Sequence, residues 1–266
     1  MSQSLGTALI TGASSGIGAV YAERLARRGH DLLLVARRGD RLEKLAADLR
    51  KQYGVKVENL VADLSQAADL ERVALRLQSD VSIQTLVNNA GVGQHGTLTG
   101  GAAVNDADLI NVNITAVTRL TLAALPRFRQ QNRGTIINIS SVLAVQALPT
   151  TSIYSGTKGY VLHFTRGLQA ELAESKVRIQ LVLPGATKTE IWDNAGELGS
   201  NIDPSAFMDV NDLVDSALAG LDQGELVTIP PIHDLGLWNA YDQASQALFG
   251  ATMTGKPAPR YAPAIL

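Results

Sequence analysis

The chain has 266 residues with 23 basic and 25 acidic side chains, and its formal net charge is −2 at pH 7. This length suffices for one α/β domain that buries about three-quarters of the surface its unfolded chain exposes. The near balance of charge gives no general electrostatic case for binding nucleic acid or an anionic membrane. The sequence contains no cysteine, which excludes disulfides, thiolate nucleophiles and cysteine metal sites.

Targeting and metal-binding signals are also missing from the sequence. The first ten residues lack a basic region and a long apolar run, so we expect no secretory signal. We find no stretch approaching the ~18 apolar residues of a membrane span. Four scattered histidines without an H-E-x-x-H motif offer no metal site. We therefore expect a cytoplasmic protein that acts on a small molecule, without metal, nucleic-acid or membrane partners.

A glycine-rich stretch, Thr11–Gly18, follows a short apolar run at 7–10 and precedes an amphipathic helix pattern that continues to Gly29. Alpha/beta folds bind a pyrophosphate at such a strand–turn–helix junction, because glycines admit the phosphates and free N–H groups meet them. The alternative is a purely structural turn. If the junction binds a dinucleotide, its contact residues are Gly12, Ser14, Ser15, Gly16, Ile17 and Gly18.

The second predicted strand, 31–36, ends at Ala36 and is followed by Arg37 and Arg38. Dinucleotide folds usually place an acid here for the ribose hydroxyls of NAD, whereas arginines hold the 2′-phosphate of NADP. We therefore expect NADP(H) as the cofactor and consider NAD(H) less suitable. Arg37 is the expected main contact because it comes first after the strand. The alternative is that both arginines are surface charges.

Polar and small residues follow three further predicted strands, at 55–61, 85–87 and 178–183. Ligands of such sheets gather at the carboxyl ends of the strands. The cofactor candidates there are Asp63, Leu64, Asn89, Ala90, Gly91, Pro184, Gly185, Thr187 and Thr189. Asp63 has an alternative role as an acid at a helix N-terminus. Asp40 and Glu43 have capping-box spacing, and Ser65 is placed to cap the next helix.

A strand at 135–139 leads to Ser141, and a turn around Pro149 then precedes a predicted helix that carries Tyr154 and Lys158. Residues four apart share one helix face, so a lysine cation there would favour the phenolate. Ser141 could donate to a substrate oxygen held by the phenol. Lys158 lies on an apolar stripe and therefore needs a partner. This arrangement predicts proton transfer to a carbonyl oxygen; the alternative is a packed tyrosine and a solvated lysine.

The remaining candidates lie on a long helix and on loops. A helix from Asp108 to about Gln131 places Asn113 among core-facing positions, either as a packing amide or as part of a polar site. We expect a substrate flap at about 190–208, helices at 210–221 and 235–249, a strand at 226–229, and a C-terminal helix and tail at about 233–266. Tentative substrate contacts are Gln94, His95, Leu143, Val145 and Trp192.

These motifs occur together in one order: T-G-x-x-x-G-x-G at Thr11–Gly18, N-N-A-G at Asn88–Gly91, then Asn113, Ser141, Y-x-x-x-K at Tyr154 and Lys158, and P-G at Pro184. Over roughly residues 5 to 230 the chain resembles the short-chain dehydrogenase/reductase family, in its single-domain NAD(P)-dependent branch. The resemblance implies one domain over 1–266, an α/β fold with a doubly wound, seven-stranded parallel sheet in the order 3-2-1-4-5-6-7, and helices on both faces. Gly156 and Gly159 depart from the small residues, such as alanine, that are usual beside the pair.

The resemblance also implies a role for each residue of the site. Tyr154 would be the general acid and base, Lys158 would lower its pKa and hold the nicotinamide ribose, Ser141 would polarise the carbonyl, and Asn113 would hold a water. The implied function is hydride transfer between NADP(H) and a carbonyl or alcohol substrate by a homodimer or homotetramer. The alternatives are a non-catalytic NAD(P)-binding redox sensor or regulatory module and, more remotely, an epimerase or dehydratase.

Overall fold

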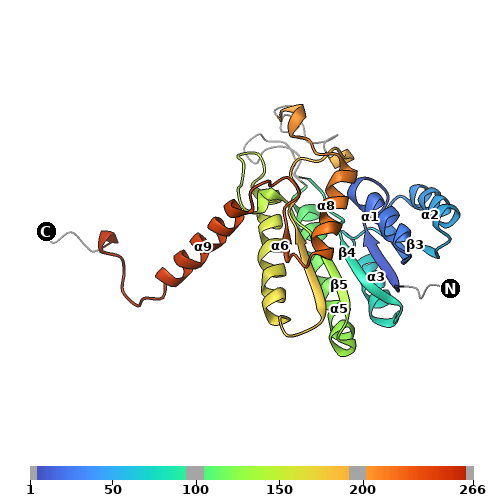
Figure 1. Ribbon diagram of the computed structural model, residues 1–266, viewed down its shortest axis with the longest axis horizontal. Helices are drawn as coiled ribbons and strands as arrows, with labels where there is room; N and C mark the ends of the chain where they lie inside the picture. Colours follow the sequence, from blue (N-terminus) through green and yellow to red (C-terminus); the bar gives the residue numbers. More distant parts are fainter. Residues whose placement is uncertain (1–4, 94–104, 192–201, 262–266) are drawn as a thin grey trace. The chain divides into compact units, whose positions relative to one another are not determined.

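The computed structural model describes residues 5–93, 105–191 and 202–261. Seven parallel strands form one sheet in the order β3-β2-β1-β4-β5-β6-β7 (Figure 1). The strands are β1 (Thr7–Thr11), β2 (Asp31–Ala36), β3 (Val57–Val61), β4 (Ile83–Asn88), β5 (Gly134–Ile139), β6 (Val177–Val182) and β7 (Val227–Thr228). The order confirms the predicted doubly wound, seven-stranded fold.

Helices cover both faces of this sheet. They are α1 (Gly16–Arg27), α2 (Gly39–Tyr53), α3 (Ala67–Ser79), α4 (Asp106–Ile110), α5 (Val117–Gln131), α6 (Ser152–Glu171) and α8 (Val210–Asp222). One buried apolar cluster joins α1, α2 and α8 to the sheet, and a second joins α3, α5 and α6 to it. Because parallel strands need crossover connections, a helix follows nearly every strand and covers one face or the other.

Alternation along each strand distributes its side chains between the two clusters. In β1, Ala8 and Ile10 pack in the cluster of α1, whereas Leu9 packs in the cluster of α3 and α5. Leu32 and Leu33 of β2 divide in the same way. Successive side chains of a strand point to opposite faces, so a central strand of a doubly covered sheet is apolar throughout. The uninterrupted apolar runs of the sequence therefore form the middle layer of the domain.

The helical run 106–131 is not one regular α-helix. Between α4 and α5 the segment Asn111–Ala116 is a π-helix, which widens the turn by one residue. The run is long and apolar enough to cross a membrane, but 56% of its most apolar stretch is buried in the protein, as in the core helix of a soluble domain. The prediction of one regular helix from Asp108 to about Gln131 is therefore wrong at the π-helix. The expectation that no stretch approaches a membrane span is wrong for this run by length and composition.

Two predicted helix caps are wrong. Helix α2 begins at Gly39 with Arg38 at its N-cap and has no side-chain cap hydrogen bond, because Glu43 instead accepts from Arg50 and Asn59. Helix α3 begins with Gln66 at its N-cap, one residue after Ser65. The hydroxyl of Ser65 donates to the carboxylate of Asp63 at 2.8 Å. Tertiary partners thus take the side chains that a local pattern assigns to the helix ends.

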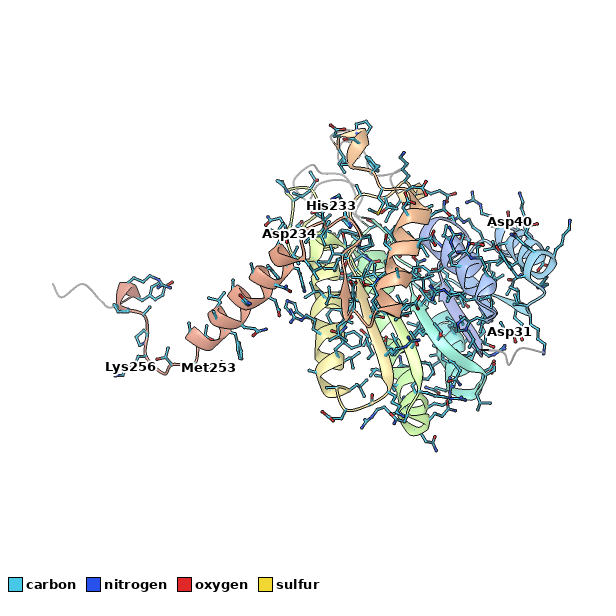
Figure 2. All side chains as sticks on the ribbon, in the orientation of Figure 1. Asp31, Asp40, His233, Asp234, Met253 and Lys256 are labelled. Carbon is cyan, nitrogen blue, oxygen red and sulfur yellow. The ribbon has the colours of Figure 1, made fainter. Side chains whose placement is uncertain are left out.

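The segment Ile232–Leu266 is a compact unit of its own and contains α9 (Leu235–Ala251). Asp234, labelled in Figure 2 at the start of this helix, caps it by accepting from the N–H of Gly236 at 2.8 Å. No residue of α9 is buried within the described chain, and a short 3-10 turn follows at Pro259–Tyr261. The helix predicted at 235–249 is therefore confirmed and extends to Ala251.

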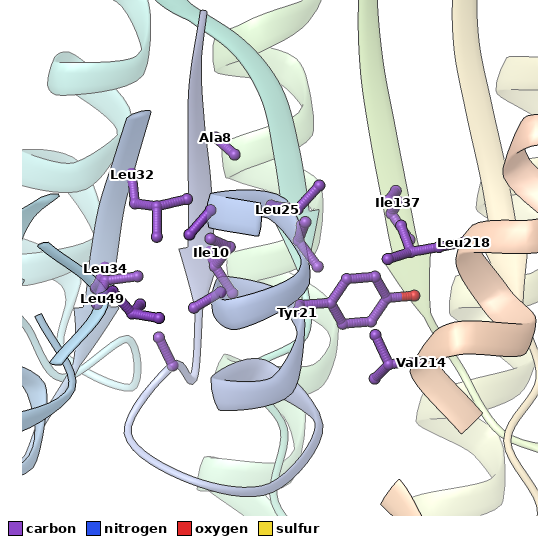
Figure 3. Close-up of a cluster of buried hydrophobic side chains, with 14 of the residues drawn as sticks. Ala8, Ile10, Tyr21, Leu25, Leu32, Leu34, Leu49, Ile137, Val214 and Leu218 are labelled. Carbon is purple, nitrogen blue, oxygen red and sulfur yellow. The ribbon is translucent and has the colours of Figure 1, made fainter. Parts of the chain in front are cut away.

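The hydroxyl of Tyr21 is a polar group that the core does not satisfy. The ring of Tyr21 is fully buried beside Val214 and Leu218 of α8 (Figure 3), and its hydroxyl has no hydrogen-bond partner among the described residues. Burial raises the pKa of Tyr21. A buried donor without a partner lowers stability by about 1–3 kcal/mol. The hydroxyl is thus a local weakness in an otherwise apolar cluster.

We predict that Tyr21→Phe raises the free energy of unfolding by about 1 kcal/mol, because it removes the unsatisfied hydroxyl and keeps the ring. Urea unfolding of both proteins measures the change. Tyr21→Ala, which removes the ring as well, should lose about 3–5 kcal/mol. A loss of stability in the phenylalanine variant would mean that the hydroxyl has a partner, such as an ordered water.

Candidate active site

A cavity of about 830 Å³ opens at the carboxyl edge of the sheet. It brings together predicted residues from every part of the sequence. Those lining it are Gly12, Ser14, Ser15, Gly16, Ile17, Arg37, Arg38, Asp63, Leu64, Asn89, Ala90, Gly91, Ser141, Leu143, Tyr154, Lys158, Pro184, Gly185, Thr187 and Thr189. Gly18, Asn113 and Val145 do not line it. Gln94, His95, Trp192 and residues 192–201 of the expected flap lie outside the described residues.

The glycine-rich turn has the backbone that an anion site requires. Gly12 and Gly16 have φ angles of 68° and 54°, in the left-handed region that favours glycine. A Cβ on Gly18 would lie 2.4 Å from the carbonyl oxygen of Gly12, so the first turn of α1 can pack against the strand end only with glycine there. Ser15 at the N-cap makes no side-chain cap hydrogen bond within the described chain. The N-terminus of α1 therefore fits a pyrophosphate.

Thr11 and Asn89 hold this turn in place. The N–H groups of Asn89 and Ala90 both donate to the Thr11 hydroxyl oxygen at 3.0 Å, and that hydroxyl donates to the carbonyl of Val87. The side-chain amide of Asn89 donates to the Thr11 carbonyl oxygen at 2.9 Å. The ends of β1 and β4 are thus joined around the cofactor end of the cavity. The positioning role of Thr11 was not predicted from the sequence, although a hydroxyl that ends a buried strand was a signal for it.

The two arginines after β2 have different surroundings. Arg38 donates to the hydroxyls of Ser14 and Ser15, with Nη2 at 3.0 and 2.7 Å from their oxygens, so its guanidinium faces the glycine-rich turn. Arg37 lines the cavity and is exposed. Arg41, in the first turn of α2, also lines the cavity. The residue at the turn is therefore Arg38, whereas the sequence analysis favoured Arg37 from its position in the chain.

The acid after β3 is held locally. The carboxylate of Asp63 accepts from the N–H of Ser65 at 3.0 Å and from its hydroxyl at 2.8 Å. Asp63 also lines the cavity. These contacts stay within the turn before α3, so both the contact with an adenine amine and the alternative role at the helix N-terminus stay predictions.

The other end of the cavity carries a phenol, an ammonium and an alcohol. Lys158 is 5% exposed, and its Nζ donates to the carbonyl oxygen of Ile139 at 3.1 Å. The same nitrogen lies 5.6 Å from the centroid of the Tyr154 ring. The Tyr154 hydroxyl is hydrogen-bonded to Ser141, whose oxygen also accepts from the N–H of Leu143 at 3.1 Å. The arrangement excludes a solvated Lys158.

Asn113 lies in the π-helix and is 1% exposed. Its amide oxygen accepts from the N–H of Val92 at 2.9 Å, and its nitrogen donates to the Val92 carbonyl oxygen and to the Thr157 hydroxyl oxygen. The Thr157 hydroxyl in turn donates to the Tyr154 carbonyl oxygen at 2.8 Å. Asn113 therefore positions the helix of Tyr154 and Lys158, and the widened π turn supports this orientation. Its implied role in holding a water stays a prediction.

Gly91 leaves room for the side chains of Asn113 and Lys158 to lie close together. A Cβ on this residue would lie 3.3 Å from the amide oxygen of Asn113 and 3.5 Å from Nζ of Lys158. The first contact is tighter than most real side chains show, and the second is an ordinary van der Waals contact. The glycine of the N-N-A-G motif therefore leaves space beside the ammonium.

Several hydrogen bonds that support the site were not predicted from the sequence. The Ser140 hydroxyl donates to the backbone carbonyl of Lys158 at 2.7 Å. The Asn88 amide donates to Asn138, whose amide donates to the Thr165 hydroxyl, and both contacts are buried at 2.9 Å. These bonds tie β4, β5 and α6 together beneath the site. The sequence signal for these hydrogen bonds was a polar residue inside an otherwise apolar strand, because a buried amide needs partners.

The pKa values of Tyr154 and Lys158, at the reactive end of the cavity, are shifted mainly by burial. Burial raises the pKa of Tyr154 to about 12, with the Ser141 hydrogen bond acting in the opposite direction. Burial lowers the pKa of Lys158 to about 8. Desolvation disfavours the charged form of each group. The predicted lowering of the tyrosine pKa by Lys158 stays a prediction, since burial and the Ser141 hydrogen bond are the causes of the Tyr154 shift.

Known proteins that are similar to this chain include dehydrogenases. A family model described as short chain dehydrogenase matches residues 6–198. A short-chain dehydrogenase from Sphingobium yanoikuyae, solved with NADPH, is 50% identical with a TM-score of 0.91 and covers 97% of this chain and 100% of its own. A bulky-bulky ketone specific alcohol dehydrogenase from Comamonas testosteroni is 45% identical with a TM-score of 0.89, over 98% and 100% of the two chains.

Curated relatives match a shorter region. A very-long-chain 3-oxoacyl-CoA reductase from Anas platyrhynchos is 34% identical over 190 residues, which is 69% of this chain and 60% of the reductase. The chain thus spans about 60% of the length of the curated relatives it matches. The solved structures, in contrast, align over their full length.

We predict that the cofactor-free protein gains stability as the pH rises from about 8 to about 10. The folded protein releases the Lys158 proton near pH 8, whereas the unfolded chain keeps it until about pH 10.5. Between these values the unfolded state binds more protons, so the free energy of unfolding rises by at most about 1.4 kcal/mol per pH unit. Urea unfolding of wild type and Lys158→Met at several pH values measures it. The methionine variant should lack the rise; an equal rise in both proteins would exclude Lys158 as its cause.

Proposed function

We propose that this chain, which belongs to the short-chain dehydrogenase family, is an oxidoreductase that transfers a hydride between NADP(H) and a ketone or alcohol. The observation that carries the proposal is the convergence of the Tyr154 hydroxyl, Ser141 and the buried Lys158 at one end of the cavity. The glycine-rich turn forms the opposite end. A dinucleotide that spans the cavity would bring its reactive ring beside the phenol.

The residues of this chain would bind and orient the reactants and move one proton. The bound nicotinamide supplies or accepts the hydride. In reduction the Tyr154 hydroxyl gives its proton to the carbonyl oxygen of the substrate, and in oxidation it takes the proton back. Ser141 holds the same oxygen by a hydrogen bond. Lys158 carries a positive charge below about pH 8 and stabilises negative charge that develops on the phenol.

NADP(H) is the preferred cofactor in this proposal. Arg38 has hydrogen bonds to Ser14 and Ser15, and Arg41 lies one turn further along α2. Two guanidinium groups beside the glycine-rich turn favour a 2′-phosphate, which arginine binds in a bidentate manner. The relative from Sphingobium yanoikuyae was solved with NADPH, which agrees with this preference.

The substrate class is a ketone with a bulky group on each side of the carbonyl. Apolar side chains line the cavity, and they include Val142, Leu143 and Leu148. The Comamonas testosteroni relative, 45% identical to this chain, is named for that class of ketone. A 3-oxoacyl thioester is the competing class, from the name of the shorter-matching reductase. A panel of diaryl ketones, aryl–alkyl ketones and acyl thioesters discriminates between the two.

A non-catalytic NAD(P)-binding module remains the alternative function. One curated relative, 33% identical, is named an inactive hydroxysteroid dehydrogenase-like protein. Against this alternative, the complete set of Ser141, Tyr154 and Lys158 lines one cavity of this chain. NADPH binding without turnover of any panel member would favour the alternative. The expected homodimer or homotetramer also stays a prediction, which light scattering of the purified chain would measure.

We predict that Tyr154→Phe lowers kcat for ketone reduction by at least about 100-fold, because a positioned general acid contributes about 10²–10⁴ in rate. NADPH binding, followed by fluorescence titration, should stay within about twofold, since the variant keeps the ring. Tyr160→Phe is the matched control. Its hydroxyl lies on the same helix but pairs with Thr118 at 2.8 Å, outside the cavity. Activity in Tyr154→Phe equal to that of the control would rule out the proposed mechanism.

We predict that Arg38→Gln lowers kcat/KM for NADPH by about 10-fold or more and leaves the value for NADH within about threefold, because a hydrogen bond between charged groups contributes about 1.5–3 kcal/mol. Steady-state kinetics with both cofactors measure the ratio. Arg37→Gln tests the alternative suggested by chain position. A large loss in Arg37→Gln together with none in Arg38→Gln would transfer the phosphate contact to Arg37.

A further inference from the structure

Glu190 closes the arginine site beside the glycine-rich turn. One of its carboxylate oxygens accepts from Nη1 of Arg38 at 2.7 Å, and the other accepts from Nη1 of Arg41. These contacts join α2 to the loop after β6, about 150 positions further along the chain. The three side chains are 40–44% exposed and line the cavity. A single carboxylate thus pairs with two guanidinium groups at the place where a cofactor phosphate is proposed to bind.

The donors around Glu190 suit a larger anion than a carboxylate. Arg38 and Arg41 carry two positive charges, of which one carboxylate neutralises only one. The Ser14 and Ser15 hydroxyls, which accept from Arg38, lie in the same place and can donate to an anion. A phosphate monoester carries about −1.5 to −2 charge at pH 7 and three acceptor oxygens. It would use all of these donors, whereas Glu190 uses two.

We propose that the Glu190 carboxylate occupies the 2′-phosphate position in the free protein and competes with that phosphate, so that it limits the preference for NADP(H) over NAD(H). The inference rests on the proposed function, since it concerns the cofactor of the same site. NADP(H) must displace Glu190 from both arginines before its phosphate binds them. NAD(H) has no 2′-phosphate and leaves the ion pairs intact.

The position of Glu190 also links this exchange to the substrate end of the cavity. Its neighbour Thr189 lies over the glycine-rich turn, since a Cβ on Gly16 would be 3.1 Å from the Thr189 methyl carbon. Ile191 packs against Gly93, where a Cβ would be 3.3 Å from an Ile191 side-chain carbon. Both neighbours line the cavity. Displacement of Glu190 therefore releases one attachment of a segment that contacts both the cofactor turn and the loop after β4.

Binding of two nucleotide fragments tests the competition without turnover. The probes are 2′,5′-ADP, which carries the 2′-phosphate, and 5′-ADP, which lacks it. Titration calorimetry gives both dissociation constants for wild type and for Glu190→Gln at one low ionic strength, because salt screens exposed pairs. Exposed ion pairs are individually weak, so we expect the variant to bind 2′,5′-ADP about three- to tenfold more tightly. Its affinity for 5′-ADP should change by less than twofold.

Glu58→Gln is the matched control. Glu58 is an exposed acid that pairs with Arg76 at 2.8 Å and does not line the cavity. This variant removes one charge and one arginine pair but should leave both dissociation constants unchanged. The Glu190→Gln substitution is also made in an Arg41→Gln variant. Because it removes one partner of Glu190, the effect of Glu190→Gln should be smaller in it than in wild type.

The ratio of the two dissociation constants decides the result. A rise of threefold or more in favour of 2′,5′-ADP in Glu190→Gln, absent from Glu58→Gln, supports the competition. Any smaller rise, or a fall, overturns it and makes Glu190 a surface ion pair or a cofactor contact. If wild type prefers 2′,5′-ADP but Glu190→Gln adds nothing, the competition fails and the NADP(H) proposal stands. If neither protein prefers 2′,5′-ADP, both fail.

Discussion

The buried ammonium of Lys158 is the constraint on which the reactive end of this protein depends. Removing a charge from water is costly unless it is paired and hydrogen-bonded, so the fold must supply acceptors and space around it. The Ile139 carbonyl supplies an acceptor, Gly91 supplies space, and Ser140 fixes the backbone of the helix at Lys158 itself. Tyr154 lies one helical turn earlier on the same face and is thereby held at the end of β5, within hydrogen-bonding reach of Ser141.

At each end of the cavity, the charges of the site are only partly compensated by the protein's own groups, and a bound ligand can complete them. At the reactive end, desolvation shifts the phenol and the amine towards their neutral forms. At the other end, Arg38 and Arg41 share one carboxylate, and they hold the pKa of Glu190 far below its ordinary value, at about 2. A dinucleotide with a 2′-phosphate changes both ends together, because it carries negative charge to the arginines and a redox-active ring to the phenol.

The sheet order followed from the family resemblance, whereas most residues that line the cavity could be predicted from the sequence itself, because glycine spacing and strand ends depend on local chemistry. It was insufficient where tertiary contacts compete with local patterns. Glu43 turns to Arg50 and Asn59 instead of capping its own helix, and Arg38 rather than Arg37 reaches the turn because the chain bends at the start of α2. The pKa of Tyr154 was also out of reach, since it depends on burial that spacing alone does not report.

The ionisation of the Tyr154 phenol tests the central claim most directly. Ultraviolet difference spectra of wild type against Tyr154→Phe, recorded over a range of pH, isolate this one phenol among the six tyrosines of the chain. In the free protein we predict a pKa of about 12. With NADP⁺ bound, positive charge on the nicotinamide should lower it by about 2 units or more. A phenol that keeps a pKa of about 12 in the complex would contradict the proposed proton transfer at neutral pH.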